Sequence, residues 1–456
     1  FIPVLSEYRV KKPHQEVQLL VQHVVGSLGA ILFVITAIGI LAAPILVMLF
    51  APGYIGHADK LHLTSNMLRI TFPYIFFISM TALVAGVLNS YGRFAIPAFT
   101  PVLLNACMIA AAVWLSPLMD EPIVGMAWGV FLAGIVQLAF QLPAVARIGQ
   151  LRLPRWGWKD PGVQKIVTLM APAIFGSSVQ QLNLLLDILI ASFLISGSIS
   201  WLYFADRLVE FPFGVFGVAI ATVILPSLSA KHSAADPQKF NQTLDWALRW
   251  SFMVGLPSTL GLIVLSGPLM ITVFQHGTFV SHDSHMAQLA LIAYAIGLLG
   301  FMFVKILAPG YYARQNTKTP VKIALVSMGL KLLLTLILVY GMVTGNYSAP
   351  HVGLALATAL SAVFNAWLLY RGLKKDGVFQ PLPGWLVFFA RTGCASLLMS
   401  LVLFFGAPEF ASWVEWHSME RVWRLFLWVC IGAGIYFAGL YLFGVKVNQL
   451  IHPGTD

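Results

Sequence analysis

The 456-residue chain is 59% hydrophobic and only 10% charged, whereas a soluble globular domain is roughly 45–50% apolar and about 25% charged. This composition excludes a water-soluble fold and a disordered chain, because too few polar residues are available to cover a soluble particle. The net charge of +10 does not indicate nucleic-acid binding, because no soluble basic domain is present. Multispanning membrane proteins are often basic, since Lys and Arg collect on their cytoplasmic side.

Twelve long apolar segments predict an all-α fold, a polytopic membrane helix bundle. Each is long enough to cross roughly 30 Å of hydrocarbon as a helix of about 20 residues, and the continuous apolar runs argue against the alternating strands of a barrel. The predicted spans cover residues 17–50, 68–90, 99–117, 123–145, 166–194, 208–228, 247–274, 286–308, 321–343, 351–370, 385–407 and 423–443. The first segment is long enough to tilt, or to bend at Pro44.

The connections between these spans differ strongly in charge. Counted alternately, one side of the membrane has 18 Lys and Arg residues and the other has three, which are Lys60, Arg207 and Arg421. The positive-inside rule then predicts an even number of spans with both chain ends in the cytoplasm. The longest connection, residues 146–165, is basic and is predicted to lie along anionic lipids between two helical bundles.

A few charged residues fall inside or beside the predicted spans. Four are near span ends, where long side chains reach the headgroups: Arg69, Arg249, Lys305 and Arg424. Lys331 lies near the middle of its span, where a cation is costly, and Asp187 lies within span 166–194. These two residues either pair with each other or separately line a water-filled path.

A third group of charges is found in "WLYFADRLVEFPFGVFG". Asp206, Arg207 and Glu210 are three and four residues apart, which puts them on one side of a helix. They either satisfy one another as a helix cap, or Arg207 offers its planar guanidinium to phosphate oxygens while the acids hold it in place. Residues that loosen or bend a membrane helix follow directly: Pro212, Gly214 and Gly217.

The sequence lacks the motifs of an enzyme. His276, His282 and His285 share one segment without a metal-binding spacing, and no phosphate-binding GxxxxGK[ST] motif occurs. We therefore predict a transporter with no catalytic residue, no metal and no cofactor. Its energy would come from sodium, protons, the membrane potential or a partner.

Five strings spread along the chain resemble the MurJ (MviN) family of lipid II flippases: "APGYIGHADK", "LRITFPYIF", "LNSYGRFAIPAFTPVLLN", "YFADRLVEFPFGVFGVAIATVILPSLS" and "LAPGYYARQNTKTPVKIA". The resemblance implies the MOP superfamily, which also includes MATE exporters, and a two-lobed architecture that works by alternating access. It implies that this chain begins where a family member finishes its second helix. The twelve spans predicted here and two preceding ones would then make up the fourteen of the family. The implied domains are the rest of the N-terminal lobe at 1–145, a cytoplasmic linker at 146–165, the C-terminal lobe at 166–370 and two additional helices at 371–456.

The resemblance also implies roles for single residues. In "ADRLVEFP", Arg207 matches a cavity cation that contacts the lipid pyrophosphate, with Glu210 beside it and Asp206 adjoining. Asp187 matches a position at which some relatives bind sodium, and Lys331 would replace that cation.

The implied function is transfer of lipid II, an undecaprenyl-pyrophosphate-linked disaccharide-pentapeptide, across the bacterial inner membrane. The implied partners are lipid II, anionic membrane lipids and the cell-wall synthesis machinery. The alternatives are a MATE-type drug or polysaccharide exporter and a membrane-embedded transferase.

Overall fold

The computed structural model describes residues 1–234 and 236–445, leaving aside the side chains at 2–3, 171–173 and 175–180. All regular elements of these residues are helical, and eleven of the helical segments are long and apolar enough to cross a membrane. The prediction of a polytopic helix bundle is thus confirmed. The chain divides into two compact units, residues 1–193 and 194–456, which are described in turn.

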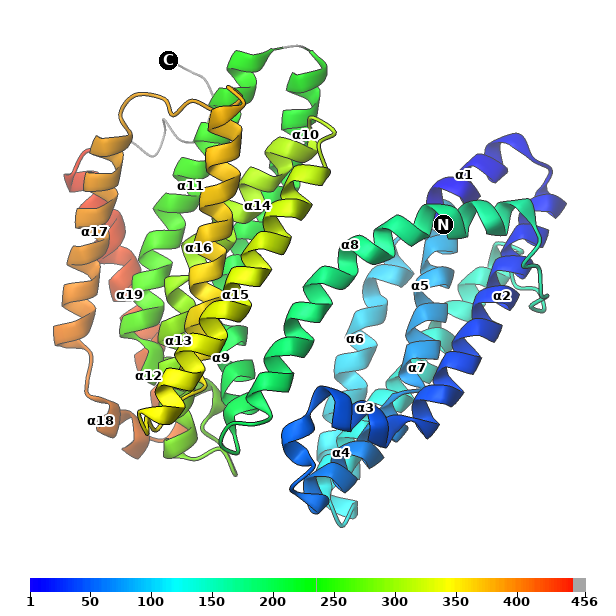
Figure 1. Ribbon diagram of the computed structural model, residues 1–456, viewed down its shortest axis with the longest axis horizontal. Coiled ribbons are helices and arrows are strands. Elements are labelled where there is room, and N and C mark those ends of the chain that lie inside the picture. The colour runs from blue at the N-terminus through cyan, green and yellow to red at the C-terminus, as the bar shows by residue number, and fades with distance from the viewer. Residues whose placement is uncertain (235, 446–456) are drawn as a thin grey trace. The chain divides into compact units, whose positions relative to one another are not determined.

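The first unit is the blue to green part of the chain in Figure 1. Its α-helices are α1 (Ile2–Lys11), α2 (His14–Leu41), α3 (Ala43–Phe50), α4 (Ala58–Thr71), α5 (Tyr74–Ser90), α6 (Ala95–Ala110), α7 (Pro122–Arg147) and α8 (Pro161–Ala191). Short turns of other helix types extend α3 and α6: η1 (Pro52–Tyr54), η2 (Ala111–Leu115) and η3 (Ser116–Leu118).

Proline divides two long apolar runs of this unit. The first predicted span forms α2 and α3, and Pro44 lies in the first turn of α3, directly after the break at Ala42. Pro73 separates α4 from α5 in the same way. Proline has no backbone N–H to donate and fits best at the start of a helix, so each run bends there.

The connection before α8 is attached to α2 along its length. The Arg155 amide donates to the Gln22 carbonyl at 3.2 Å, and the Gly157 amide donates to Ser27 Oγ at 3.1 Å. His23 Nδ1 lies 3.0 Å from an Asp160 carboxylate oxygen. Residues 155–160 are therefore fixed to the first unit.

Helix α8 continues this attachment. Val163 and Ile166 are buried in the core of the first unit, and Lys165 forms an ion pair with Glu7 at 2.6 Å. The compact units consequently divide after residue 193, whereas the implied lobes divide at 146–165. The assignment of residues to lobes stays a prediction.

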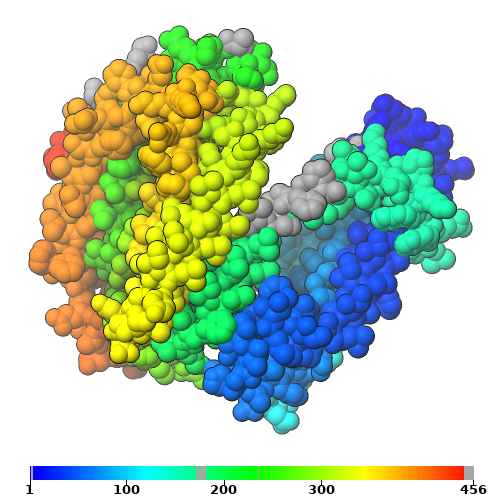
Figure 2. All heavy atoms as spheres, viewed as in Figure 1, coloured from blue at the N-terminus to red at the C-terminus, as the bar shows by residue number. Residues whose placement is uncertain are grey.

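The second unit is the green to red part of the chain in Figure 1. Its helices are α9 (Ser198–Pro212), the π-helix η4 (Phe213–Val218), α10 (Ala219–Ser233), α11 (Pro237–Val264), α12 (Ser266–Phe274), α13 (Ser281–Ile296), α14 (Leu298–Tyr312), α15 (Lys318–Thr344), α16 (Val352–Lys375), α17 (Trp385–Gly406), α18 (Phe410–Glu415) and α19 (Ser418–Leu442). Figure 2 shows the side chains of α15 and α16, yellow to orange, side by side on one face of this unit.

Two apolar clusters hold the second unit together. One joins α10, α11, α14 and α16, with Leu244, Ile306 and Leu373 fully buried. The other joins α11 and α12 to α17 and α19 through residues such as Phe388 and Tyr436. The last two spanning helices therefore pack on α11 as part of this unit, while residues 446–456 of the implied C-terminal segment lie outside the described residues.

A buried carboxylate fixes the start of α17 to α11. Asp245 is 1% exposed and accepts hydrogen bonds from Arg249 Nε at 2.7 Å, Trp385 Nε1 at 2.6 Å and the Leu382 amide at 3.1 Å. The Arg249 guanidinium also donates to the Pro383 carbonyl at 3.0 Å. Arg249, whose side chain we expected to reach the headgroups, instead forms a short ion pair inside the unit.

The eleven spans correspond to eleven of the twelve predicted ones. The twelfth prediction, 166–194, falls on α8, a helix of 31 residues whose described apolar part is Gln181–Ala191. At about 1.5 Å per residue, α8 is roughly 46 Å long, which exceeds the hydrocarbon thickness of about 30 Å.

Candidate functional site

Helix α9 has one buried and one exposed face. Its buried residues recur at helical spacing: Ser198, Trp201, Leu202, Ala205, Val209 and Pro212. Trp201 Nε1 donates to an Asp283 carboxylate oxygen at 2.9 Å, which anchors this face to α13. The opposite face presents Tyr203, Arg207 and Glu210, each of them exposed on the second unit.

Arg207 is held on this face by two neighbours on its own helix. Its Nη1 lies 2.6 Å from a Glu210 carboxylate oxygen, and the two side chains are 51% and 50% exposed. Its guanidinium carbon lies 4.8 Å from the centre of the Tyr203 ring. An arginine held between a carboxylate and an aromatic ring retains further N–H donors for an anion.

The structure brings the predicted pair Arg207 and Glu210 together, and Asp206 is half-buried beside them. Tyr203 was not among the predicted residues, although its spacing of four residues from Arg207 is the signal that would have identified it. One expectation was wrong: Arg207 does not lie in a connection before a span beginning at 208. It lies within α9, which begins at Ser198, so the charged group belongs to the span itself.

A π-helix follows directly after this group. Pro212 ends α9, and residues Phe213–Val218 form η4 before the α-helix resumes at Ala219. Short π-helical segments inside α-helices often occur at functional sites. A Cβ added at Gly214 would meet no atom within 4 Å, whereas one at Gly217 would lie 3.5 Å from the Met302 side chain. The hinge role of this segment stays a prediction.

Lys305 of α14 lies beside the same irregular segment. Its Nζ is 5.7 Å from the centre of the Phe213 ring, and the residue is exposed on the second unit. Lys305 is seven residues before the end of α14 at Tyr312, so it lies farther from the helix end than the predicted span bound at 308 implied. It adds a second cation near the helix break that follows Arg207.

Lys331 is buried inside the second unit, with 7% of its surface exposed. It lies midway along α15 on a buried stripe with Ser327, Thr335 and Val339. The Ser361 hydroxyl of α16 donates to the Ser327 carbonyl at 2.7 Å, so this stripe faces α16. The structure thus places Lys331 among polar and small side chains between two helices.

Asp187 belongs to the first unit, near the end of α8, and is half-buried. Lys331 belongs to the second unit. Because Asp187 and Lys331 belong to different units, the pairing of these two residues and the sodium site at Asp187 stay predictions. Among the described residues, no three His, Cys, Asp or Glu side chains gather in a way that could hold a metal ion.

Comparison with known proteins gives a consistent result. The chain matches the family described as lipid II flippase MurJ over residues 1–426. It is 44% identical to the probable lipid II flippase MurJ of Vibrio cholerae, over 99% of this chain and 86% of that protein. It is 41% identical to the probable lipid II flippase MurJ of Haemophilus influenzae, over 99% and 89%, and 39% identical to the lipid II flippase MurJ of Burkholderia cenocepacia, over 98% and 86%.

Solved structures agree in fold. A lipid II flippase MurJ in an inward closed conformation superimposes with a TM-score of 0.78 at 24% identity, over 99% of this chain and 90% of that chain. An inward-facing multidrug resistance MATE family transporter of the MOP superfamily gives a TM-score of 0.59 at 12% identity, over 83% and 88%. By family match and by identity over nearly its whole length, this chain belongs to the MurJ family of lipid II flippases, which are transporters and not enzymes.

Proposed function

We propose that this lipid II flippase binds the pyrophosphate of its substrate through Arg207 on the exposed face of α9. The observation that carries the proposal is a half-exposed guanidinium in the interior of a spanning helix, held by Glu210 at 2.6 Å and by the Tyr203 ring. A cation within a span is costly in hydrocarbon and is expected where it meets water or an anion.

The chemistry of the group suits a diphosphate ester. A guanidinium has five N–H donors in a fixed planar arrangement, which matches two phosphate oxygens at once. Glu210 holds one edge of the guanidinium, so the substrate would meet Arg207 already oriented. Lys305, near the following helix break, would add positive charge along the same path.

Transport would proceed by alternating access between the two lobes, and no covalent bond would change. The π-helix Phe213–Val218 lies six residues after Arg207, so rearrangement at this segment would move the bound pyrophosphate relative to the rest of the second unit. Irregular backbone of this kind is tolerated in membranes where it borders a cavity or another helix. A sodium or proton gradient or the membrane potential would supply the energy.

The excess of Lys and Arg in alternate connections supports an inner-membrane orientation with both ends of the chain in the cytoplasm. Anionic membrane lipids and the cell-wall synthesis machinery are the further partners of this proposal.

The test is complementation in a bacterium depleted of its own flippase. Arg207→Ala should insert normally but fail to support cell-wall growth. Arg424→Ala is the matched control, because Arg424 also pairs with a nearby carboxylate, Glu420, at 2.7 Å but lies on α19. Growth with Arg207→Ala equal to growth with the control variant would remove Arg207 from the proposed role.

A further inference from the structure

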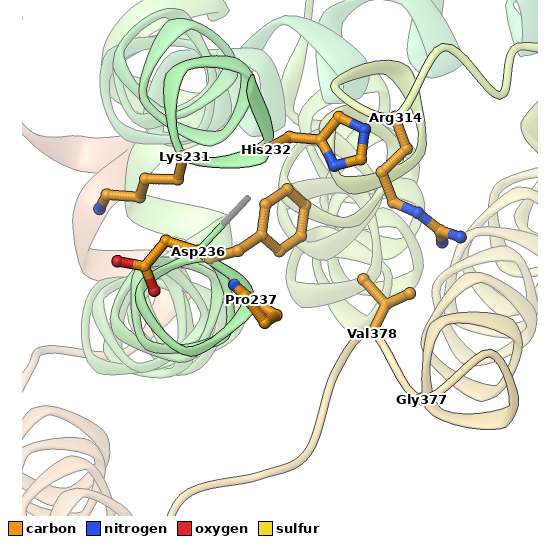
Figure 3. A pocket seen from close by; sticks show the side chains of 8 residues that line it. Lys231, His232, Asp236, Pro237, Arg314, Gly377 and Val378 are labelled. Atoms are coloured by element: carbon orange, nitrogen blue, oxygen red, sulfur yellow. The ribbon is translucent and has the colours of Figure 1, made fainter. Parts of the chain in front are cut away.

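A pocket of about 370 Å³ opens at helix ends of the second unit, and none of its lining residues belongs to α9. Four helix ends surround it, those of α10, α11, α14 and α16. Figure 3 shows Lys231 and Asp236 on one side of it and His232 and Arg314 on the other, with Val378 below Arg314. Phe240, which is 4% exposed, also lines it.

The lengths of the surrounding helices indicate that the pocket lies beyond the hydrocarbon. The run from Ser198 to Ser233 has 36 residues and α11 has 28, which correspond to about 54 Å and about 42 Å of helix against roughly 30 Å of hydrocarbon. The polar sequence "KHSAADPQKFN" at residues 231–241 places this excess length at the pocket end. A ligand from water or from the headgroup layer can therefore reach it.

The surroundings of the pocket are strongly basic. Segments 230–241, 313–323 and 371–380 hold eight Lys and Arg residues and only two Asp residues. Asp236 already caps α11, accepting from the Lys239 amide at 2.9 Å and pairing with Lys239 Nζ at 3.2 Å. The amide hydrogen bond lowers the pKa of Asp236 below its usual value, so this carboxylate stays ionised and is neutralised locally.

The Arg314 guanidinium retains N–H donors for a further ligand. The one described hydrogen bond of its side chain runs from Nη1 to an Asp376 oxygen at 3.4 Å, which is long for a charged pair. The Arg314 side chain is 27% exposed and that of Asp376 is 43% exposed. An anion entering the pocket can thus bind the guanidinium in competition with a loosely held carboxylate.

His232 adds a second hydrogen-bonding side chain to the pocket, beside Arg314. Its ring meets the Phe240 ring edge to face, with centres 6.4 Å apart, and both belong to the pocket lining together with Val378. The imidazole offers a hydrogen-bond donor on the same side of the pocket as Arg314, next to apolar lining residues (Figure 3). Basic pockets between helix ends on the cytoplasmic side of membrane proteins are suited to phosphate groups.

We propose that this pocket is a second anion site that binds a phosphate ester through Arg314 and His232. The site lies outside the α9 group and does not depend on the role of Arg207. The phosphate could come from an anionic phospholipid headgroup or from a soluble phosphate ester, and both sources share the chemistry that the pocket recognises.

The experiment uses the purified full chain in two settings. In detergent, binding of inorganic phosphate and of glycerol phosphate is measured by calorimetric titration. In nanodiscs, retention of phosphatidylglycerol is compared with retention of phosphatidylcholine by mass spectrometry. Binding of the soluble esters identifies a soluble ligand, selective retention of phosphatidylglycerol identifies the headgroup, and both outcomes support the site.

Two variants that break the same ion pair make the test specific. Arg314→Gln should weaken phosphate binding about tenfold or more, because it removes a charged donor. Asp376→Asn removes the competing carboxylate and should leave binding as tight as in the unaltered chain or tighter. Lys322→Gln, an exposed cation of α15 outside the lining, should change binding less than twofold.

The proposal is overturned if no phosphate probe binds. It is also overturned if Asp376→Asn or Lys322→Gln weakens binding as much as Arg314→Gln does. An equal loss of binding with Asp376→Asn would assign a purely structural role to the ion pair. An equal loss with Lys322→Gln would reduce the site to a diffuse basic surface.

Discussion

The carboxylate of Asp245 offers a sharp test of what attaches the last two spanning helices to the second unit. It is 1% exposed and accepts three hydrogen bonds, two of them from the connection into α17 and its first residue. Asp245→Asn keeps the shape of the side chain but removes its charge. Arg249, only 18% exposed, would then lose its counter-ion in a mostly buried position.

The expected cost is about 3 kcal/mol, the lower end of the roughly 3–5 kcal/mol that breaking a buried ion pair costs. The lower end applies because Arg249 keeps the Pro383 carbonyl at 3.0 Å and its contact with the Trp385 ring, 4.9 Å from the guanidinium carbon. The free energy of unfolding is measured in detergent by titration with SDS, and protease cleavage between residues 376 and 384 reports local release.

The matched control is Glu420→Gln. Glu420 and Arg424 also form a carboxylate–arginine pair four residues apart on one helix, but their side chains are 42% and 41% exposed. Exposed pairs of this kind contribute about 0.3–0.5 kcal/mol. If both variants lowered the free energy of unfolding by the same amount, or if Asp245→Asn left the connection resistant to protease, the reasoning from burial would be refuted.

Three further predictions concern the segments around α9 and the buried histidine. Gly214→Ala places a Cβ in open space and raises helix propensity by about 0.5–1 kcal/mol, so thermal stability should not fall while transport in a lipid II flipping assay slows. Glu210→Gln removes the partner of Arg207 at 2.6 Å and should weaken lipid II binding by less than about fivefold, in keeping with the roughly 0.2–1 kcal/mol of an exposed ion pair. Burial lowers the pKa of His351, so its contribution to stability is complete above the unfolded pKa of about 6.5 and is lost as the pH falls below it; melting temperatures at pH 7.5 and 5.5 should differ more for the unaltered chain than for His351→Gln.

Each of these predictions has a contrary result. Transport by Gly214→Ala at the unaltered rate would show that the π-helical segment does not need its flexibility. A loss of lipid II binding by Glu210→Gln as large as that caused by removing Arg207 would make the carboxylate a direct contact. Equal pH dependence with and without His351, which is fully buried and bonded to the Met286 carbonyl at 3.0 Å, would place the titrating group elsewhere.

Apolar length was sufficient to predict the eleven helical segments that are long enough to cross a membrane. It was less informative at span edges, because polar residues end an apolar window while the helix continues. Arg207 shows this: the charges at 206, 207 and 210 lowered the local hydropathy, yet Trp201 and Leu202 pack against the core and keep α9 helical from Ser198.

Contacts between distant residues could not be predicted from local patterns. Asp245 and Trp385 are 140 residues apart, and Arg314 and Asp376 are 62 apart. Only the packing of α11 against α17, or of α14 against α16, brings these side chains together. The buried role of Arg249 and the basic pocket therefore emerged from the fold, whereas the pair Arg207 and Glu210, three residues apart on one helix, was visible in the sequence.

The most direct measurement of the central claim is the affinity of purified protein for lipid II, with Arg207→Gln compared with Arg424→Gln. The interior cation of α9 should account for recognition of the pyrophosphate, so Arg207→Gln is expected to bind lipid II at least about tenfold more weakly, while Arg424→Gln binds it like the unaltered chain. Equal affinity of the two variants for lipid II would contradict the assignment of Arg207 to the substrate.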